Sequence, residues 1–273
     1  IGLGGADTLD GGSGIDTADY SASATGVDIS TDGSVGSGGD ADGDRLTSIE
    51  VINASGQDDV MTGSSADESF YGNAGDDLID GKGGADVIDG GTGTDTASYA
   101  SSLAGVNIDL AAGTSTGGDA QGDSFNSIET IIGSSHADNL SAAAAGNTLI
   151  GGASDDVLTG NAGVDDLQGG ANNDTLAGLG GADTLDGGTG TDTADYSASD
   201  NGVQINLAAG TGTGGHAAGD TLSNIENVTG SDYDDSLVGD SAVNQLIGGD
   251  GDDLLEGAGG ADSLDGGAGN DTR

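Results

Sequence analysis

The chain has 273 residues, of which 48 are acidic and only 3 are lysine or arginine, so its formal net charge is −45. So few cationic side chains argue against binding to the phosphate backbone of a nucleic acid. No apolar run approaches the roughly 18 residues that cross a bilayer. The absence of cysteine excludes disulfides and thiolate metal sites. With 3% aromatic residues, 58 glycines and no proline, the composition is typical of a disordered chain or a chain of turns without a conventional core. The many carboxylates favour metal cations as partners.

A nine-residue repeat fills four blocks, at residues 2–19, 54–98, 133–195 and 230–273. Residues 151–195, for example, read GGASDDVLT GNAGVDDLQ GGANNDTLA GLGGADTLD GGTGTDTAD. The sixth position of every repeat is Asp, Glu or Asn, and the eighth position is apolar in all repeats except the last. A low-complexity segment would not keep two such columns in phase, so the repeat predicts a regular structure.

Three spacers of 34 residues each separate the blocks, at residues 20–53, 99–132 and 196–229. Each spacer begins with Tyr, continues with an alternating apolar segment and ends on SIE or NIE. Alternation such as that of residues 106–110 predicts a half-buried strand. Because a flexible linker would not retain this periodicity, we expect the spacers to be wider coils of the same structure.

The repeat matches the pattern GGxGxDxLx, the calcium-binding nonapeptide of RTX proteins. The sequence therefore resembles the RTX, or hemolysin-type calcium-binding, family. The resemblance implies an all-β fold, a right-handed parallel β-roll or β-helix solenoid in which two repeats make one coil and calcium is bound in the turns. We expect residues 1–273 to form a single continuous solenoid with three 34-residue wider-coil insertions.

The chemistry of the repeat suits calcium, which takes six to eight oxygen ligands from carboxylates and carbonyls. Glycine-rich turns can direct carbonyl oxygens toward a common point. The resemblance implies that the sixth-position Asp completes this set, with on the order of a dozen ions for the chain. The predicted calcium ligands are Asp7, Asp16, Asp77, Asp86, Asp95, Asp156, Asp165, Asp174, Asp183, Asp192, Asp253, Asp262 and Asp271. Asp59, Asp138 and Asp235 lie in repeats without the glycine pair and are expected to bind weakly.

Folding is expected to require the metal. One buried Leu or Ile gains roughly 1.5–3 kcal/mol, whereas ordering nine backbone residues costs about 1–2 kcal/mol each. Ladder hydrogen bonds add only about 1 kcal/mol apiece. We therefore expect disorder without calcium and a rigid rod with it.

Several other residues recur in the spacers. Tyr20, Tyr99 and Tyr196 are expected to fill the interior where the roll widens. An Asp stands six residues before a Glu in each spacer, which favours a structural contact; these pairs are Asp44 and Glu50, Asp123 and Glu129, and Asp220 and Glu226. Residues 40–44 read DADGD, like the opening of an EF-hand loop, and leave an additional calcium site open as an alternative. His136 and His216 are expected to be exposed turn residues.

The two ends of the sequence are in phase with each other. Residues 2–23 and 178–199 differ at only two positions, and Ile1 of a second copy placed after Arg273 would complete the final repeat. We expect the chain to be one period of a longer array or of a head-to-tail fibre, so its predicted partner is itself.

Three functions are compatible with the sequence. The favoured one is a calcium-dependent extracellular structural protein: a segment of a surface or biofilm-matrix fibre, S-layer-like array or adhesin stalk. The alternatives are a folding appendage of a type I-secreted RTX enzyme, such as a protease, lipase or epimerase, and a polysaccharide-binding module. No nucleophile, base and orienting group form a recognisable set, so catalysis within the chain is not expected. The location that the resemblance implies is the bacterial cell surface or exterior, reached by secretion.

Overall fold

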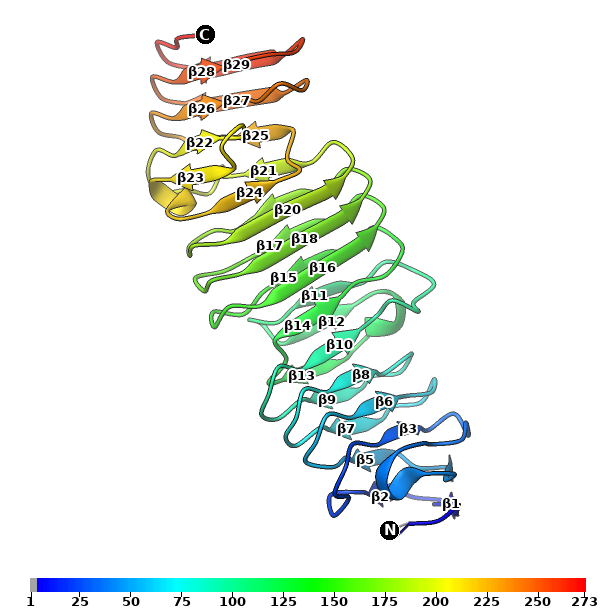
Figure 1. The fold of residues 1–273 in the computed structure, drawn as a ribbon. Helices are drawn as coiled ribbons and strands as arrows, with labels where there is room; N and C mark the ends of the chain where they lie inside the picture. Colours follow the sequence, from blue (N-terminus) through cyan, green and yellow to red (C-terminus); the bar gives the residue numbers. More distant parts are fainter. Residues whose placement is uncertain (1–3) are drawn as a thin grey trace. The chain divides into compact units, whose positions relative to one another are not determined.

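The computed structural model describes residues 4–273, which form short strands, turns and three 3-10 helices and contain no α-helix. The chain divides into two compact units, Ile1–Ser135 and His136–Arg273. In both, successive strands stack in parallel sheets (Figure 1). The predicted all-β roll is therefore confirmed for each unit, whereas continuity of one solenoid over residues 1–273 stays a prediction.

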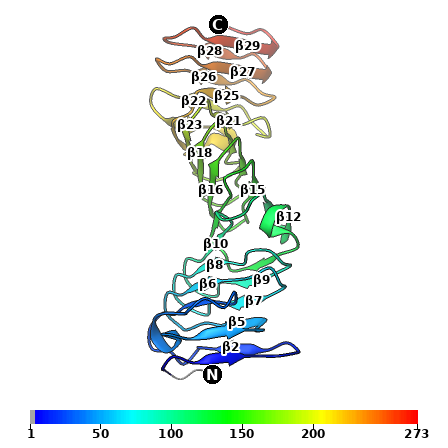
Figure 2. The same cartoon turned by 90° about the vertical axis from the view of Figure 1, so that its right-hand side faces the viewer.

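Unit 1 is a roll with two opposed sheets. One sheet runs in the order β3 (Asp28–Ser30), β6 (Val60–Thr62), β8 (Leu78–Asp80), β10 (Thr96–Ser98) and β14 (Thr130–Ile132). The other runs in the order β2 (Thr17–Asp19), β5 (Val51–Asn53), β7 (Ser69–Tyr71), β9 (Val87–Asp89) and β13 (Ser124–Asn126). The remaining elements are β1 (Thr8–Asp10), β4 (Arg45–Thr47), β11 (Asn107–Asp109), β12 (Thr114–Thr116), η1 (Gly39–Ala41) and η2 (Gly118–Ala120). Figure 2 shows β6 and β8 on one side of this roll and β7 and β9 on the other.

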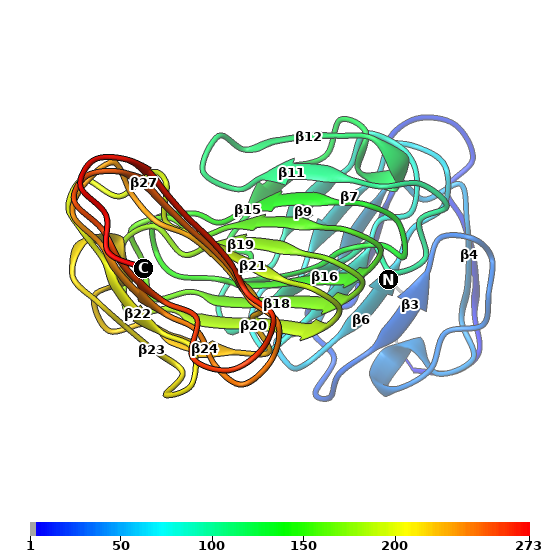
Figure 3. The same cartoon turned by 90° about the horizontal axis from the view of Figure 1, so that it is seen from above.

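Unit 2 repeats the arrangement. One sheet runs in the order β15 (Asn139–Ser141), β17 (Val157–Thr159), β19 (Thr175–Ala177), β21 (Thr193–Asp195), β25 (Asn227–Thr229), β27 (Gln245–Asp250) and β29 (Ser263–Ala268). The other runs in the order β16 (Thr148–Ala153), β18 (Asp166–Ala171), β20 (Thr184–Thr189), β24 (Thr221–Ser223), β23 (Thr211–Thr213), β22 (Gln204–Asn206), β26 (Ser236–Val238) and β28 (Leu254–Glu256). The helix η3 spans Gly215–Ala217. From above, β16, β18 and β20 run side by side (Figure 3).

The core of each roll is a column of eighth-position side chains. Leu149 pairs with Leu167, and Leu167 pairs with Leu185, at an interval of 18 residues. All three side chains are fully buried. Because side chains alternate along a strand, the residues on either side of each leucine point outward. One coil is therefore two repeats, as the resemblance implied.

The spacers differ from the simple wider coils expected from the sequence, because each contains a reversed segment. In unit 2, β23 pairs antiparallel with both β22 and β24. The spacer therefore adds three strands to one sheet, between β20 and β26, but only β25 to the other sheet. The apolar periodicity predicted the strands, but not the reversal, which depends on pairing between neighbouring strands of one spacer.

Candidate metal centres

A hydrogen-bond ladder joins the sixth-position residues of successive coils. The backbone amide of Asp156 donates to Oδ1 of Asp174 at 2.8 Å, and that of Asp174 donates to Oδ1 of Asp192 at 2.8 Å. The same bond, from a backbone amide to Oδ1 of the residue 18 positions later, recurs in both units. It links Asp59 to Asp77, Glu68 to Asp86, Asp77 to Asp95, Asp138 to Asp156, Asn147 to Asp165, Asp165 to Asp183, Asp235 to Asp253, Asn244 to Asp262 and Asp253 to Asp271. The ladder fixes one oxygen of each carboxylate and leaves the other to be accounted for.

The second oxygen is buried without a hydrogen-bond donor in most of the turns. This holds for Oδ2 of Asp16, Asp77, Asp86, Asp95, Asp156, Asp174, Asp183, Asp192 and Asp253. All of these side chains except that of Asp16 are at most 2% exposed. A buried acceptor without a partner is costly, and most native proteins avoid it. Nine repetitions of the same orphaned oxygen indicate a common missing partner, and a cation would satisfy it.

Backbone carbonyls lie beside these orphaned oxygens. A Cβ placed on Gly151 would lie 2.4 Å from Oδ2 of Asp156 and 2.7 Å from the carbonyl oxygen of Gly169. At Gly72 the corresponding distances are 2.1 Å to Oδ2 of Asp77 and 2.5 Å to the carbonyl oxygen of Gly90. Any side chain on the first residue of the turn would therefore collide with both oxygens. A carboxylate with nearby carbonyls is the donor chemistry that calcium prefers, so the residues present fit this metal.

The backbone at the second position of the turn separates two classes of turn. In one class φ is positive, as at Asn73 (73°), Lys82 (59°) and Leu179 (61°), and where the Asp four residues later is buried, as after these three residues, its Oδ2 atom is orphaned. In the other class the second-position amide donates back to the carboxylate, as Ser231 does to Oδ2 of Asp235 at 2.6 Å. Turns of the first class leave a carboxylate oxygen available to a metal. In turns of the second class, which we call self-satisfied, that oxygen already accepts a hydrogen bond from the turn's own backbone.

Burial gives the open turns unusual protonation behaviour. It raises the pKa of Asp77, Asp86 and Asp156 to about 7, and of Asp174 and Asp183 to about 6. The ladder amide donates to each carboxylate and lowers its pKa, and neighbouring carboxylates raise it again. Without a cation these carboxylates are poorly stabilised in their charged form.

No group of three or more His, Asp or Glu side chains is placed to hold a metal ion among residues 4–273. Carbonyl oxygens would therefore have to supply most of the ligands.

The family model for the RTX calcium-binding nonapeptide repeat matches residues 1–18, 62–97, 132–167, 159–194, 221–255 and 238–272, which is more than half of the chain. The chain belongs to the RTX calcium-binding repeat family. RTX repeats bind calcium and are typical of secreted proteins. A comparison with curated proteins gave no match.

The four remaining predicted RTX ligands are in different surroundings. Asp165 is buried, but its Oδ2 atom accepts a hydrogen bond from the amide of Asn161 at 2.9 Å. Asp7 is exposed, and Asp262 and Asp271 are half-buried. Calcium binding by each of the thirteen predicted residues remains a prediction, for which the orphaned oxygens provide the stronger candidates.

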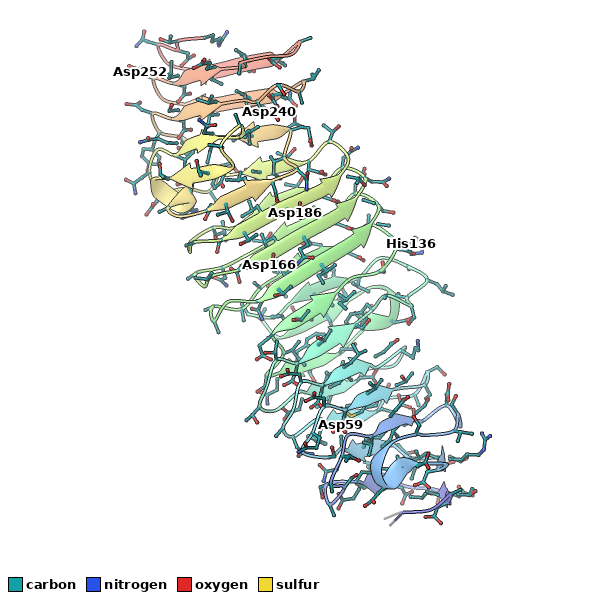
Figure 4. The ribbon with its side chains drawn as sticks, viewed as in Figure 1. Asp59, His136, Asp166, Asp186, Asp240 and Asp252 are labelled. Atoms are coloured by element: carbon teal, nitrogen blue, oxygen red, sulfur yellow. The ribbon has the colours of Figure 1, made fainter. Side chains whose placement is uncertain are left out.

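Two of the Asp residues expected to bind weakly lie in self-satisfied turns. Ser55 donates its amide to Oδ2 of Asp59 at 2.8 Å, and its hydroxyl contacts both oxygens of the same carboxylate. Ser231 donates its amide to Oδ2 of Asp235 at 2.6 Å and its hydroxyl to Oδ1 at 2.9 Å. Figure 4 shows Asp59 among the side chains of unit 1. The structure thus gives a physical reason to expect weak calcium binding at these two turns. A serine stands in place of the second glycine, and its amide and hydroxyl donate hydrogen bonds to the carboxylate oxygens that would otherwise face a metal.

The spacer residues have the structural roles expected from their recurrence. Tyr20, Tyr99 and Tyr196 are at most 2% exposed. Each hydroxyl donates to Oδ2 of the spacer Asp; the pairs are Tyr20 with Asp44 (2.9 Å), Tyr99 with Asp123 (2.5 Å) and Tyr196 with Asp220 (2.9 Å). The other oxygen of each Asp accepts a ladder amide, from Asp7, Asp86 and Asp183 respectively.

Because both oxygens of Asp44 are engaged, the EF-hand-like alternative at residues 40–44 is not supported. His136 is exposed as expected, whereas His216 is only partly exposed and its Nδ1 atom is buried.

A second ladder on the outside of the turns was missed from the sequence. The exposed fifth-position Asp155 accepts at Oδ1 from the amide of Asn173, 18 residues later, and Asn173 accepts from Thr191 in the same way. Asp234 and Asp252 continue the pattern in a later block, where Asp252 lies in the turn before β28 (Figure 4). The recurrence of Asp and Asn at the fifth position was the available signal.

Proposed function

We propose that this chain is a calcium-dependent structural segment of a secreted protein, part of a surface or matrix fibre, an S-layer-like array or an adhesin stalk. The observation that carries the proposal is the series of orphaned, buried Oδ2 atoms beside turn carbonyls. Such turns are costly when empty and favourable when filled, so calcium stabilises the folded state by mass action. A chain of this kind unfolds where calcium is scarce and becomes rigid outside the cell.

The proposal includes a binding role rather than a catalytic one, with calcium as the ligand and copies of the same chain as partners. Ile1, which the predicted head-to-tail join would use, lies outside the described residues. Within the described part of the chain, no helix is long and apolar enough to span a membrane.

Sedimentation velocity at micromolar protein tests the proposal, first in EGTA and then in millimolar calcium. We expect an expanded monomer in EGTA and a folded species in calcium, with far-UV circular dichroism reporting β-structure only in the second case. Species that grow with protein concentration only in calcium would support association. A calcium-bound monomer at every concentration would contradict self-association, and an unchanged spectrum on adding calcium would contradict the structural role of the metal.

A further inference from the structure

The last turn of a repeat block before a spacer has the buried, orphaned carboxylate oxygen of the other turns that are open to a metal. It differs from them in which residue supplies the neighbouring carbonyl. In the turn at residues 187–192, Oδ2 of Asp192 is orphaned and its side chain is fully buried. The next coil on this edge contains no glycine-rich turn, because the spacer closes with three residues between β24 and β25. A repeat glycine therefore cannot supply the neighbouring carbonyl.

A spacer carbonyl lies in that place instead. A Cβ on Gly187 would lie 2.1 Å from the carbonyl oxygen of Asn224 and 2.7 Å from Oδ2 of Asp192. In unit 1, a Cβ on Gly90 would lie 2.4 Å from the carbonyl oxygen of Ser127 and 2.4 Å from Oδ2 of Asp95. These are the same relationships that Gly151 has to Asp156 and to the carbonyl of Gly169. The spacer thus reproduces the oxygen pair of a repeat turn by supplying its carbonyl from outside the repeat block, while the carboxylate still comes from the repeat.

The backbone of all three spacers adopts an uncommon conformation at this point. Ser48, Ser127 and Asn224 have φ values of 53°, 51° and 53°. Residues other than glycine rarely occupy this left-handed region, and such strain is concentrated at functional positions. Its recurrence at the residue whose carbonyl faces the orphaned carboxylate indicates that the conformation serves to direct that carbonyl.

A Glu three residues before the end of each spacer takes the place of the next Asp in the ladder. Oε2 of Glu226 accepts from the amide of Asp192 at 2.8 Å, and Oε2 of Glu129 accepts from the amide of Asp95 at 2.9 Å. Oε2 of Glu50 accepts from the amide of Asp16 at 2.9 Å. Each Glu therefore holds the backbone of the turn and adds a negative charge near it.

The other edge of the same coil provides a contrast. A Cβ on Gly178 would lie 2.4 Å from Oδ2 of Asp183, the orphaned carboxylate at that edge. There the spacer presents Asp220, whose oxygens are held by the amide of Asp183 and by the hydroxyl of Tyr196. The spacer therefore offers a carbonyl beside the orphaned oxygen at one edge of the coil and a hydrogen-bonded carboxylate at the other.

We propose that each spacer completes a calcium site of the preceding repeat block, which we call a junction site. In the junction site of the third spacer, the carbonyl oxygen of Asn224 joins Oδ2 of Asp192 as a ligand, and Glu226 positions the turn. The corresponding residues are Ser127, Asp95 and Glu129 for the second spacer, and Ser48, Asp16 and Glu50 for the first. This inference rests on the proposed function, because it requires calcium in the open turns.

Calcium binding by the full chain tests the third junction site. Asn224→Val places a β-branched residue where φ is 53°, which turns the carbonyl away, whereas Asn224→Gly keeps the conformation. Both variants lose the hydrogen bond from Asn224 to Asp186, so they form a matched pair. Equilibrium dialysis with calcium should show one ion fewer per chain, or one ion bound about tenfold more weakly, for Asn224→Val only. Circular dichroism in calcium checks that each variant folds.

Glu226→Gln provides a second test and decides the matter if Asn224→Val does not fold. The glutamine retains an acceptor for the amide of Asp192 but loses the charge, so we expect one ion to bind about tenfold more weakly. Wild-type affinity and ion number in Glu226→Gln, together with any folded Asn224→Val, would overturn the junction site. A wild-type chain that bound no calcium at all would instead overturn the proposed function.

Discussion

The backbone amide of Asp77 donates a hydrogen bond to Oδ1 of Asp95, 2.9 Å away and 18 residues further along the chain. This bond leaves Oδ2 of Asp95 buried without a partner. One oxygen of the repeat Asp therefore organises the backbone of the roll, and the other is available to a cation. The two roles predict different effects for different substitutions.

Replacing Asp174 by Asn should separate these roles. The amide side chain can still accept the ladder bond from Asp156, but it provides no negative charge for the orphaned position. We expect the calcium concentration at the folding midpoint to rise, because the site loses its carboxylate ligand. Circular dichroism titration with calcium measures this midpoint. Asp166→Asn, on the outward side of β18 (Figure 4), is the control and should titrate like the wild type.

The free energy of unfolding should depend on the tyrosine that begins each spacer. Tyr196→Phe would remove the hydroxyl that donates to Oδ2 of Asp220 and leave that buried oxygen without its 2.9 Å partner. We expect a loss of about 1–3 kcal/mol, which is typical of an unsatisfied buried polar group. Thermal or urea unfolding in saturating calcium measures the loss. Tyr233→Phe, at a tyrosine that is 49% exposed, should have little effect, and equal losses in the two variants would contradict the assignment.

The free energy of unfolding should fall with rising pH in the absence of calcium, whereas the affinity for calcium should rise with pH. In the calcium-free fold, burial raises the pKa of Asp77 and Asp156 from the ordinary 3.8 to about 7. Between these values the folded chain binds more protons than the unfolded chain, so the free energy of unfolding falls as pH rises. Calcium needs the ionised carboxylate, so its affinity should fall as pH drops below about 7.

Circular dichroism at pH 5 and pH 8 checks both signs. In EGTA we expect more β-structure at pH 5 than at pH 8. In calcium titrations we expect a higher midpoint concentration at pH 5. A calcium midpoint independent of pH would show that these carboxylates are not the groups that the metal meets.

A methyl group in the turn should be poorly tolerated. Gly170 has φ of +111°, and a Cβ there would lie 2.3 Å from the carbonyl oxygen of Gly152. Gly170→Ala should therefore lower the free energy of unfolding by about 1–3 kcal/mol in calcium. Gly56→Ala is the control, since a Cβ at Gly56 would meet nothing within 4 Å. Denaturant unfolding of both variants decides between a steric effect of the turn and a general effect of replacing glycine.

Much of the fold could be predicted because the repeat carries its own geometry. The apolar eighth position predicted a buried column such as Leu149, Leu167 and Leu185, and strand alternation then fixed which side chains face outward. The spacer Asp, Glu and Tyr residues could be identified because they recur in all three copies. The reversed strand β23 could not be predicted, since its pairing with β22 and β24 is not marked by any periodicity.

By itself the sequence determined the nine-residue period, the residues of the core column and the resemblance to calcium-binding repeats, because the period repeats the same local chemistry along the chain; the two-repeat coil was implied by the resemblance. Only the tertiary structure decided which turns are open to a metal. Asp165 and Asp174 occupy the same position in their repeats, yet Oδ2 of Asp165 accepts the amide of Asn161 and Oδ2 of Asp174 has no partner. The difference lies in the backbone angles of the turn and in the carbonyls of the next coil, and these are set when coils 18 residues apart are packed together.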